Sequence, residues 1–172
     1  LTAENLQHSH PILPCILSKL FNLMLMCSYV PAQFGYSYTI PLSKIKECRT
    51  KSMKTDDFRG IAISCVLSKV FEYCIFDRFK EFLLTADNQF GFKKGIGCNH
   101  AIYTARKIIE QLITEGSTVN LCAIDLRKAY DRTNHHALFL KLMKRNLPSE
   151  LLFTLEFWLS NCWTCVRWGS SV

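Results

Sequence analysis

The sequence lacks an apolar run pure enough to cross a membrane. Its longest apolar stretch begins at Ile12 and is interrupted by Pro14, Lys19 and Asn22, whereas a spanning helix needs about twenty mostly apolar residues. A buried amphipathic helix is therefore predicted, and no partner membrane is expected. No basic leader precedes the apolar run. With 49% hydrophobic and 20% charged residues, a disordered chain is not expected either.

Acidic residues are scarce relative to basic ones. The 172 residues include 14 Asp and Glu against 21 Lys and Arg, a formal net charge of +7. This balance favours a polyanionic partner such as nucleic acid. A moderately basic domain without such a partner fits the charge equally well.

A regular cysteine spacing is also missing. The nine cysteines are an odd number at irregular positions, which indicates a reduced intracellular protein, nuclear or cytoplasmic, and not a disulfide scaffold. Four of them lie in apolar runs and are expected to be small core residues: Cys27, Cys65, Cys74 and Cys122. One C-x-x-C pair without a second pair is a weak signal, so zinc or redox chemistry is not expected there.

Apolar periodicity predicts a helix-rich α+β chain. Residues 14–29, 66–79, 100–116, 136–146 and 148–161 have helical spacing. Ser64 and Asn99 are expected to cap two of these helices, and Gly116 to end one. Strands are predicted at 36–42, 118–126 and 162–166, and the lysine-rich stretch 43–60 is expected to be a hairpin tip or loop.

The strand predicted at 118–126 is apolar enough to be covered on both faces, and it ends near Asp125. A carboxylate at a strand end can reach a cleft in a fixed direction. Magnesium binds one or two such carboxylates and completes its shell with phosphate and water. Asp125 is thus a candidate metal ligand for phosphoryl transfer. The alternative is that Asp125 caps the following turn.

The stretch "AIDLRKAYDRTNHHAL" resembles the first catalytic-carboxylate motif of reverse transcriptases, especially those of non-LTR (LINE-like) retrotransposons. The match runs without a gap from Asp125 to Asp131, and His135 and Leu138 follow in register. Such a resemblance implies the fingers and partial palm of a right-hand polymerase, with a small incomplete antiparallel sheet.

Other segments resemble the family's blocks in the same order. "LTAENL" and "VPAQFGYSYTIPLSK" resemble the lead-in, with Lys44 in the lysine position. "DFRGIAISCVLSKVFEYCI" resembles the fingers motif through Arg59, Ser68, Lys69, Phe71 and Glu72. "NQFGFKKGIGCNHAI" resembles the following block through Gln89, Phe90, Gly91, Phe92, Lys93 and Gly95.

The chain also departs from the family. Gly60 stands where a proline is usual, and Phe34 stands near the position where the family commonly has a tryptophan. Cys98 and Asn99 stand where Ser or Thr is usual. The second catalytic block, an aromatic residue or Ala followed by two Asp, does not occur in this sequence. We therefore expect a truncated piece of a polymerase, as the non-initiator Leu1 also suggests, with the rest of the palm and the thumb missing.

The resemblance implies a role for each matching residue. Asp125 would bind both catalytic Mg²⁺ ions, with the Leu126 carbonyl helping one of them, as in two-metal catalysis. Tyr130 would be a steric gate that selects deoxynucleotides, unless it is a core aromatic. Lys44 and Arg59 would bind the triphosphate of the incoming dNTP. The alternative is an exposed lysine-rich hairpin that only contacts solvent.

The block with Gly91, Lys93, Lys94 and Gly95 would lie near template phosphates. The chain would then form one continuous domain, with a fingers-like region and its basic hairpin at 1–98 and a partial palm at 99–172. Its partners would be an RNA template, a DNA primer and a dNTP. We expect the chain to be inactive alone. The alternatives are a non-catalytic RNA-binding remnant, a decayed element, or a reverse transcriptase of the group II intron maturase type.

Overall fold

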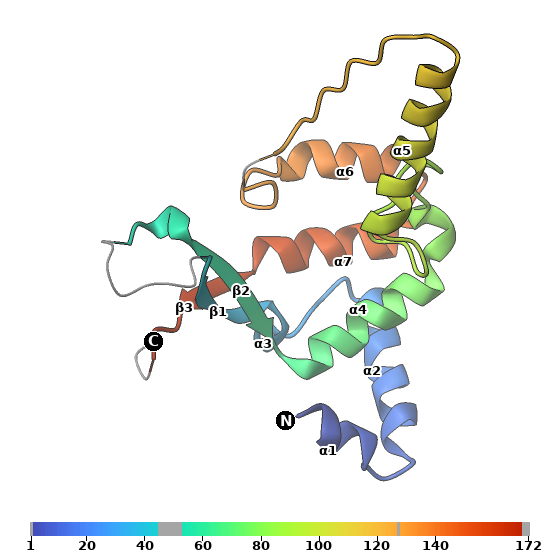
Figure 1. Cartoon of the computed structure of the whole chain (residues 1–172). Coiled ribbons are helices and arrows are strands. Elements are labelled where there is room, and N and C mark those ends of the chain that lie inside the picture. The colour runs from blue at the N-terminus through green and yellow to red at the C-terminus, as the bar shows by residue number, and fades with distance from the viewer. Residues whose placement is uncertain (1, 45–52, 127, 170–172) are drawn as a thin grey trace. The chain divides into compact units, whose positions relative to one another are not determined.

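The computed structural model of the chain describes residues 2–44, 53–126 and 128–169 (Figure 1). Two compact units are present. The first is formed by Leu1–Phe82 together with His135–Val172, and the second by Leu83–Asn134. The expected division between 98 and 99 concerns roles within a polymerase and stays a prediction.

The first unit combines helices with a small sheet. Its elements are α1 (Ala3–Gln7), α2 (Leu13–Met26), α3 (Ala32–Gly35), β1 (Tyr36–Ser43), η1 (Thr55–Asp57), β2 (Phe58–Ser64), α4 (Val66–Arg78), α6 (His135–Lys144), α7 (Ser149–Ser160) and β3 (Trp163–Val166). The 3₁₀ helix η2 (Lys80–Leu83) follows α4. The helices predicted around 14–29, 66–79, 136–146 and 148–161 are confirmed.

An aromatic cluster forms the core of this unit. Phe71 of α4 is 1% exposed, and its ring centroid lies 5.0 Å from that of Phe21 on α2 and 5.5 Å from that of Trp158 on α7. Phe34 of α3 lies 6.2 Å from Phe71. Aromatic pairs at such tilted geometries add to the free energy gained by burial. The cluster therefore holds four helices together.

Gly35 permits the close approach of α3 to the end of α7. A methyl group in place of its hydrogen would collide with the backbone carbonyl of Asn161. Gly35 is buried and directly precedes β1, while Asn161 lies just before β3. The contact therefore lies where two neighbouring strands of the sheet begin.

The three strands form a sheet in the order β2-β1-β3 (Figure 1). β1 and β2 are antiparallel, with register from Ser37↔Ser64 to Ser43↔Phe58. The predicted fold class is confirmed, but the sheet is mixed, because β3 pairs with β1 in parallel. A long helical connection separates β1 from β3 in the sequence, and such a connection is what a parallel pair requires.

Residues 58–60 were expected to belong to a hairpin tip or loop and Ser64 to cap the following helix, and both predictions are wrong at these positions. They form β2, and Ser64 pairs with Ser37, so the N-cap of α4 is Cys65. Gly60 and the neighbouring lysines hid the strand, because glycine has a low strand propensity. The predicted hairpin tip at 45–52 lies outside the described residues.

A mostly apolar cavity of about 410 Å³ lies between α2 and α4. Its lining includes Phe21, Ile75 and Arg78. The Arg78 guanidinium donates a hydrogen bond of 2.7 Å to the Asn22 side-chain oxygen, which holds the arginine against that wall.

The second unit is built around α5 (Cys98–Thr114). The helix is capped at Gly97 and not at Asn99, so that cap prediction is wrong by two residues. The predicted stop at Gly116 is confirmed. Gly116 has a φ of +78°, and the Ser117 amide donates back to the Leu112 carbonyl at 2.9 Å. A left-handed residue at this position is a common end for a helix.

Residues 118–126 run extended beyond α5 but belong to no strand within the described ranges (Figure 1). The prediction of a strand covered on both faces is wrong, because Leu121 is 78% and Ile124 87% exposed. A strand is stabilised by hydrogen bonds to a neighbour, and no described segment supplies that neighbour. The apolar pattern is present without the partner that would bury it.

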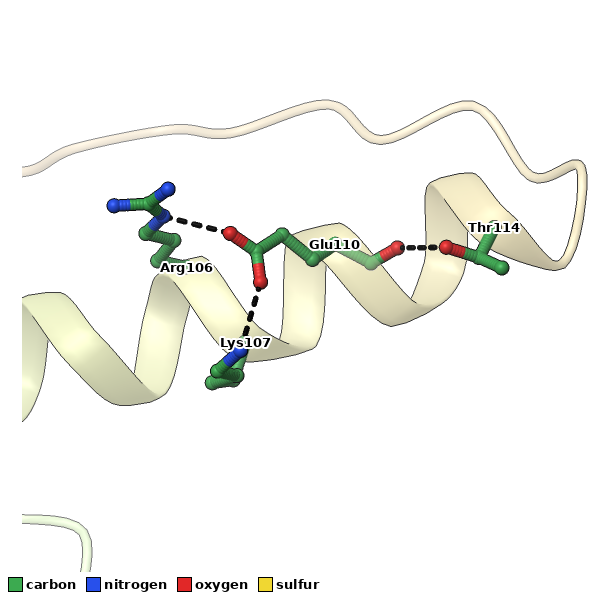
Figure 2. A network of polar contacts seen from close by, with 4 residues as sticks. All are labelled: Arg106, Lys107, Glu110 and Thr114. Atoms are coloured by element: carbon green, nitrogen blue, oxygen red, sulfur yellow. Dashed lines mark hydrogen bonds and ion pairs between the residues drawn. The ribbon is translucent and has the colours of Figure 1, made fainter.

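Polar contacts run along α5, which has no buried residue. Glu110 accepts a hydrogen bond from Arg106 at 2.7 Å and another from Lys107 at 3.0 Å, and Thr114 donates to the Glu110 carbonyl at 2.8 Å (Figure 2). The bonds from Arg106, the larger cause, and from Lys107 lower the pKa of the Glu110 carboxyl. Neighbours three and four residues apart stabilise a helix in this way.

The prediction that four cysteines are core residues is wrong. Cys27, Cys74 and Cys122 are exposed, and Cys65 is half-buried. Small thiols tolerate both environments, so an apolar sequence neighbourhood does not fix their depth. The eight cysteines in the described part of the chain are free thiols.

No helix in the described part of the chain combines the length and apolar character needed to cross a bilayer.

Candidate functional site

The β1–β2 hairpin brings two of the predicted site residues together. Arg59 lies opposite Leu42 in the antiparallel ladder. Lys44 follows the end of β1, and its amide donates to the Asp57 carbonyl at 2.9 Å. Both side chains are exposed, so the hairpin presents two cations at one end of the ladder.

The Lys44 ammonium is oriented by the hairpin. It donates a hydrogen bond of 2.7 Å to the Asp56 carbonyl. A neutral carbonyl leaves the positive charge uncompensated, and an ammonium has two further protons to donate. Lys44 can therefore hold this bond and still bind a phosphate oxygen.

The single Asp-Asp pair of the sequence, Asp56–Asp57, lies in this hairpin and follows Thr55. Asp57 accepts a hydrogen bond of 2.9 Å from the Lys54 amide and so caps η1. This contact is local and structural. Asp57 is therefore a turn-forming residue, and the pair follows Thr55 and not the aromatic residue or Ala of the catalytic block.

In the second unit, Asp125 is exposed at the end of the extended segment, and it accepts no hydrogen bond from the residues whose positions the structure describes. The proposed capping role is thus not seen. Tyr130 is 78% exposed, so the alternative that it packs in a core is wrong. Leu126, whose carbonyl was expected to assist a metal, is also exposed.

A turn connects these residues to α6. Lys128 has a φ of +51°, the Arg132 amide donates to the Lys128 carbonyl at 3.1 Å, and the Thr133 amide donates to the Tyr130 carbonyl at 3.2 Å. The turn positions the Tyr130 backbone and leaves its ring in solvent.

The described residues alone do not fit a site for two magnesium ions. No cluster of three metal-ligating side chains occurs among residues 2–44, 53–126 and 128–169. Asp125 supplies one carboxylate, whereas two bridging ions need more hard oxygen ligands than one side chain offers.

The glycine-containing block folds on itself. The Lys93 ammonium donates to the Ala86 carbonyl at 2.7 Å, and the Gln89 side chain donates to the Gly91 carbonyl at 3.2 Å. Gly95 has a φ of +78°, a backbone conformation that glycine adopts without strain. Lys93 is half-buried and holds the loop closed, whereas Lys94 is exposed, so Lys94 is the better candidate for a phosphate contact.

Several residues of the fingers-like motif have structural positions. Ser68 is fully buried, and its hydroxyl donates to the Cys65 carbonyl at 2.7 Å. Lys69 and Glu72 form an exposed ion pair at 3.1 Å. Together with Phe71 in the core, these residues stabilise α4. Arg59 of this motif lies on the sheet, is exposed, and forms no ion pair with the part of the chain that the structure describes.

One more cation on the sheet was missed from the sequence. The Arg167 amide donates to the Thr39 carbonyl at 3.0 Å, and its guanidinium lies 5.7 Å from the centre of the Tyr38 ring. The sequence contains the residues but not the pairing of β3 with β1, which brings them together.

The C-x-x-C pair does not form a joint site. The Cys162 thiol donates to the Trp158 carbonyl at 3.2 Å, and the Cys165 thiol faces the Ser37 carbonyl at 3.9 Å. Burial raises the pKa of the Cys162 thiol, and the Glu72 carboxylate raises it further. A raised pKa disfavours the thiolate that metal binding and redox exchange require.

Comparison with known proteins identifies the relationship. Residues 46–172 match the family model described as reverse transcriptase (RNA-dependent DNA polymerase). The chain is 26% identical over 163 residues to the probable RNA-directed DNA polymerase from transposon X-element of Drosophila melanogaster, and 25% identical over 149 residues to that from transposon BS of the same organism. These matches cover 91% and 84% of this chain but 17% and 16% of the relatives' own length.

Proposed function

Since the chain belongs to the reverse transcriptase (RNA-dependent DNA polymerase) family, we propose that it is the nucleotide- and template-binding part of an RNA-directed DNA polymerase of a non-LTR retrotransposon. The complete enzyme would add deoxynucleotides to the 3′-hydroxyl of a primer on an RNA template. The observation that carries the proposal is that the family match includes Arg59, Asp125 and Tyr130.

The hairpin would bind the triphosphate of the incoming nucleotide. Arg59 offers a planar guanidinium for bidentate contact with phosphate oxygens, and Lys44 offers a compact charge. Both cations project from the same end of the β1–β2 ladder, so one phosphate chain would contact both. Their exposure before ligand binding means that little desolvation of the protein opposes the encounter.

Asp125 and Tyr130 would act on the sugar and on the reacting phosphate. The Tyr130 ring would occupy the space that a ribose 2′-hydroxyl needs. Magnesium is the metal the family relationship implies, and it would supply charge stabilisation in the complete enzyme. This chain would contribute Asp125 to such a site, and the remaining ligands would come from another part of the polymerase.

The experiment compares the isolated chain with a longer polymerase that contains it. The isolated chain should show no primer extension above background on an RNA template. In the longer enzyme, Tyr130→Ala should raise the ratio of ribonucleotide to deoxynucleotide incorporation by roughly 10- to 200-fold, the range that one group in a pocket contributes. Tyr103→Ala, a change of another exposed tyrosine, on α5, is the matched control.

Two results would contradict the proposal. One is robust template-directed synthesis by the isolated chain, because Asp125 alone would then suffice. The other is an unchanged sugar preference in the Tyr130→Ala enzyme, which would remove the steric role.

A non-catalytic RNA-binding protein is the second candidate, and the formal net charge of +7 favours it. This candidate predicts salt-dependent RNA binding by the isolated chain, with no loss of function in Asp125→Asn. If the longer enzyme keeps its primer extension after Asp125→Asn, the polymerase role of this residue is refuted and the second candidate stands.

A further inference from the structure

The cavity between α2 and α4 has an apolar floor. Four of its lining residues are buried, namely Phe21 and Leu25 of α2 and Phe71 and Ile75 of α4. On each helix the two residues are four positions apart, so they lie on one face. Leu6 of α1 is half-buried and adds to the lining. The volume of about 410 Å³ falls within the range of small-ligand pockets, roughly 300 to 1,000 Å³.

Polar groups lie at the rim of this cavity, on the neighbouring row of each helix. Ser18 and Asn22 of α2 and Cys74 and Arg78 of α4 belong to the lining and are exposed. The Asn22 side chain links the two helices, because it donates to the Ser18 carbonyl at 2.8 Å and accepts from the Arg78 guanidinium at 2.7 Å. The rim therefore holds an oriented guanidinium beside an apolar floor.

The positive charge of Arg78 is not neutralised by the surrounding chain. Its acceptor in the rim, the Asn22 side-chain oxygen, is uncharged, and no carboxylate within the described ranges forms an ion pair with Arg78. A guanidinium has five N–H donors, so donors remain for a ligand. A carboxylate accepts two parallel hydrogen bonds from such a group. The rim is therefore suited to a carboxylate.

We propose that this α2–α4 pocket binds a small amphiphile with a hydrocarbon body and a carboxylate head, the chemistry of a medium-chain fatty acid. The hydrocarbon body lies on the buried rings and aliphatic side chains of the floor, and the carboxylate pairs with the Arg78 guanidinium. Pockets for small molecules commonly combine an apolar lining with a few polar groups that fix the orientation of the ligand. Arg78, held by Asn22, is the orienting group here.

The length of the pocket sets the size of the ligand. Val70 and Arg78 both belong to the lining, and they are eight residues apart on α4, about 12 Å at roughly 1.5 Å per residue. Decanoate has a hydrocarbon chain of about this length. Its head would reach Arg78 while its tail reaches the level of Val70.

A helix from another part of a longer polymerase, or from a second copy of the chain, is the competing occupant. The rim favours the small anion, because a helix lying across it would cover Ser18, Asn22 and Arg78, and a covered polar group without a partner costs free energy. A carboxylate pairs with the guanidinium and leaves the rest of the rim in water. None of these residues belongs to the proposed nucleotide or template contacts, so the pocket would bind its ligand with or without polymerase activity.

The test is isothermal titration calorimetry of the whole chain in reducing buffer, without nucleic acid, nucleotide or metal. The probes are octanoate, decanoate, decanol and decyltrimethylammonium, each below the concentration at which it aggregates. Decanoate should bind roughly 15-fold more tightly than octanoate, because each buried CH₂ group contributes roughly fourfold. It should bind about tenfold more tightly than decanol, which has no charge to pair with Arg78, and the cationic probe should bind more weakly still.

Two variants locate the body of the ligand. Leu17 of α2 is a half-buried lining residue, and Leu17→Trp should fill the pocket and weaken decanoate binding at least tenfold. Ile16→Trp is the matched control, because Ile16 is 53% exposed and lies outside the lining, so this variant should bind as wild type does. Circular dichroism verifies that both variants are folded.

Two further variants locate the head, and they change exposed side chains, so they test the site even if the tryptophan variants do not fold. Arg78→Gln should weaken decanoate binding about tenfold and remove the preference for decanoate over decanol. Arg106→Gln, a change of an exposed arginine on α5, should leave both affinities as in the wild type.

Three outcomes overturn the proposal. The first is equal affinity for decanoate, decanol and the cationic probe. The second is wild-type affinity for decanoate in both Leu17→Trp and Arg78→Gln. The third is a dimer of the wild-type chain in sedimentation that Leu17→Trp abolishes and decanoate does not affect, which would assign the pocket to a second copy of the chain.

Discussion

At the scale of single residues, side-chain size decides what the chain can bring together. Gly35 has no side chain, so α3 approaches the Asn161 carbonyl directly. Phe71 has a large one, and it fills the space between three other aromatic rings. Gly35 allows the close contact between α3 and the end of α7, and Phe71 fills the volume between the helices. Both are needed where β1 and β3 begin beside the aromatic cluster.

Gly35→Ala should destabilise the chain by about 1–3 kcal/mol, the usual cost of forcing an extra group into a packed site. The methyl group would push α3 away from the end of α7 and so disturb the start of β1. Chemical denaturation measures the loss. The control is Gly91→Ala, because a methyl group at Gly91 meets nothing within 4 Å. Equal stability of the two variants would show that the close approach is not required.

At the scale of elements, the local sequence predicts helices better than strands. All seven residues from Val66 to Glu72 lie in a continuous helix whose buried stripe continues to Ile75 and Phe79, and helical periodicity alone located it. β2 was missed, because its hydrogen bonds go to β1 and not to its own neighbours. The segment 118–126 shows the opposite error, in which an apolar pattern is present without a partner strand.

The side-chain bonds of α5 should respond to pH, because two of them are accepted by the Glu110 carboxylate, which loses its charge when it is protonated. The pKa of Glu110 is lowered in the folded chain, chiefly by Arg106 and then by Lys107. The ionised Glu110 carboxylate therefore stabilises the folded chain at every pH above the pKa that Glu110 has in the unfolded chain. This stabilisation is lost as the pH falls through the lower pKa that Glu110 has in the folded chain. A carbon-13 NMR titration of the Glu110 carboxyl should show a midpoint below that of an ordinary glutamate.

The matched variant removes both donors. Arg106→Ala with Lys107→Ala should return the Glu110 midpoint toward its ordinary range, and high salt should move the wild-type midpoint in the same direction, because exposed ion pairs are screened. A midpoint that neither change affects would mean that the two bonds do not form in solution.

At the scale of the whole molecule, burial is distributed unevenly between the two units. The buried apolar residues of the described chain lie outside 83–134. The first unit therefore has a core of its own, and the second depends on local hydrogen bonds. The predicted catalytic residue Asp125 and the predicted gate Tyr130 both lie in this second unit.

Hydrogen exchange should separate the two units. Amides of 98–126 should exchange at least tenfold faster than those of α4 and α7, because local opening there exposes no core. Mass spectrometry of proteolytic fragments measures both sets in one sample, so α7 is the internal control. Equal protection across the chain would contradict this division.

The site was predictable to the extent that it depends on residue order. The spacing from Asp125 to Asp131 and the arginine at 59 identify the family from the sequence alone. The contact of Arg167 with Tyr38 was not predictable, because it depends on the register of β3 with β1, two segments separated by more than a hundred residues. The hydrogen bond from Lys93 to the Ala86 carbonyl was not predictable either, because this pairing depends on how the loop closes.

Of the eight free thiols in the described chain, seven are exposed. Dissolved oxygen can convert such groups to disulfides between molecules, or to higher oxidation states. A purified sample kept without reductant would then accumulate covalent dimers and aggregates unrelated to any biological assembly. Any study of the oligomeric state of this chain therefore has to begin with a reducing buffer or with serine in place of these cysteines.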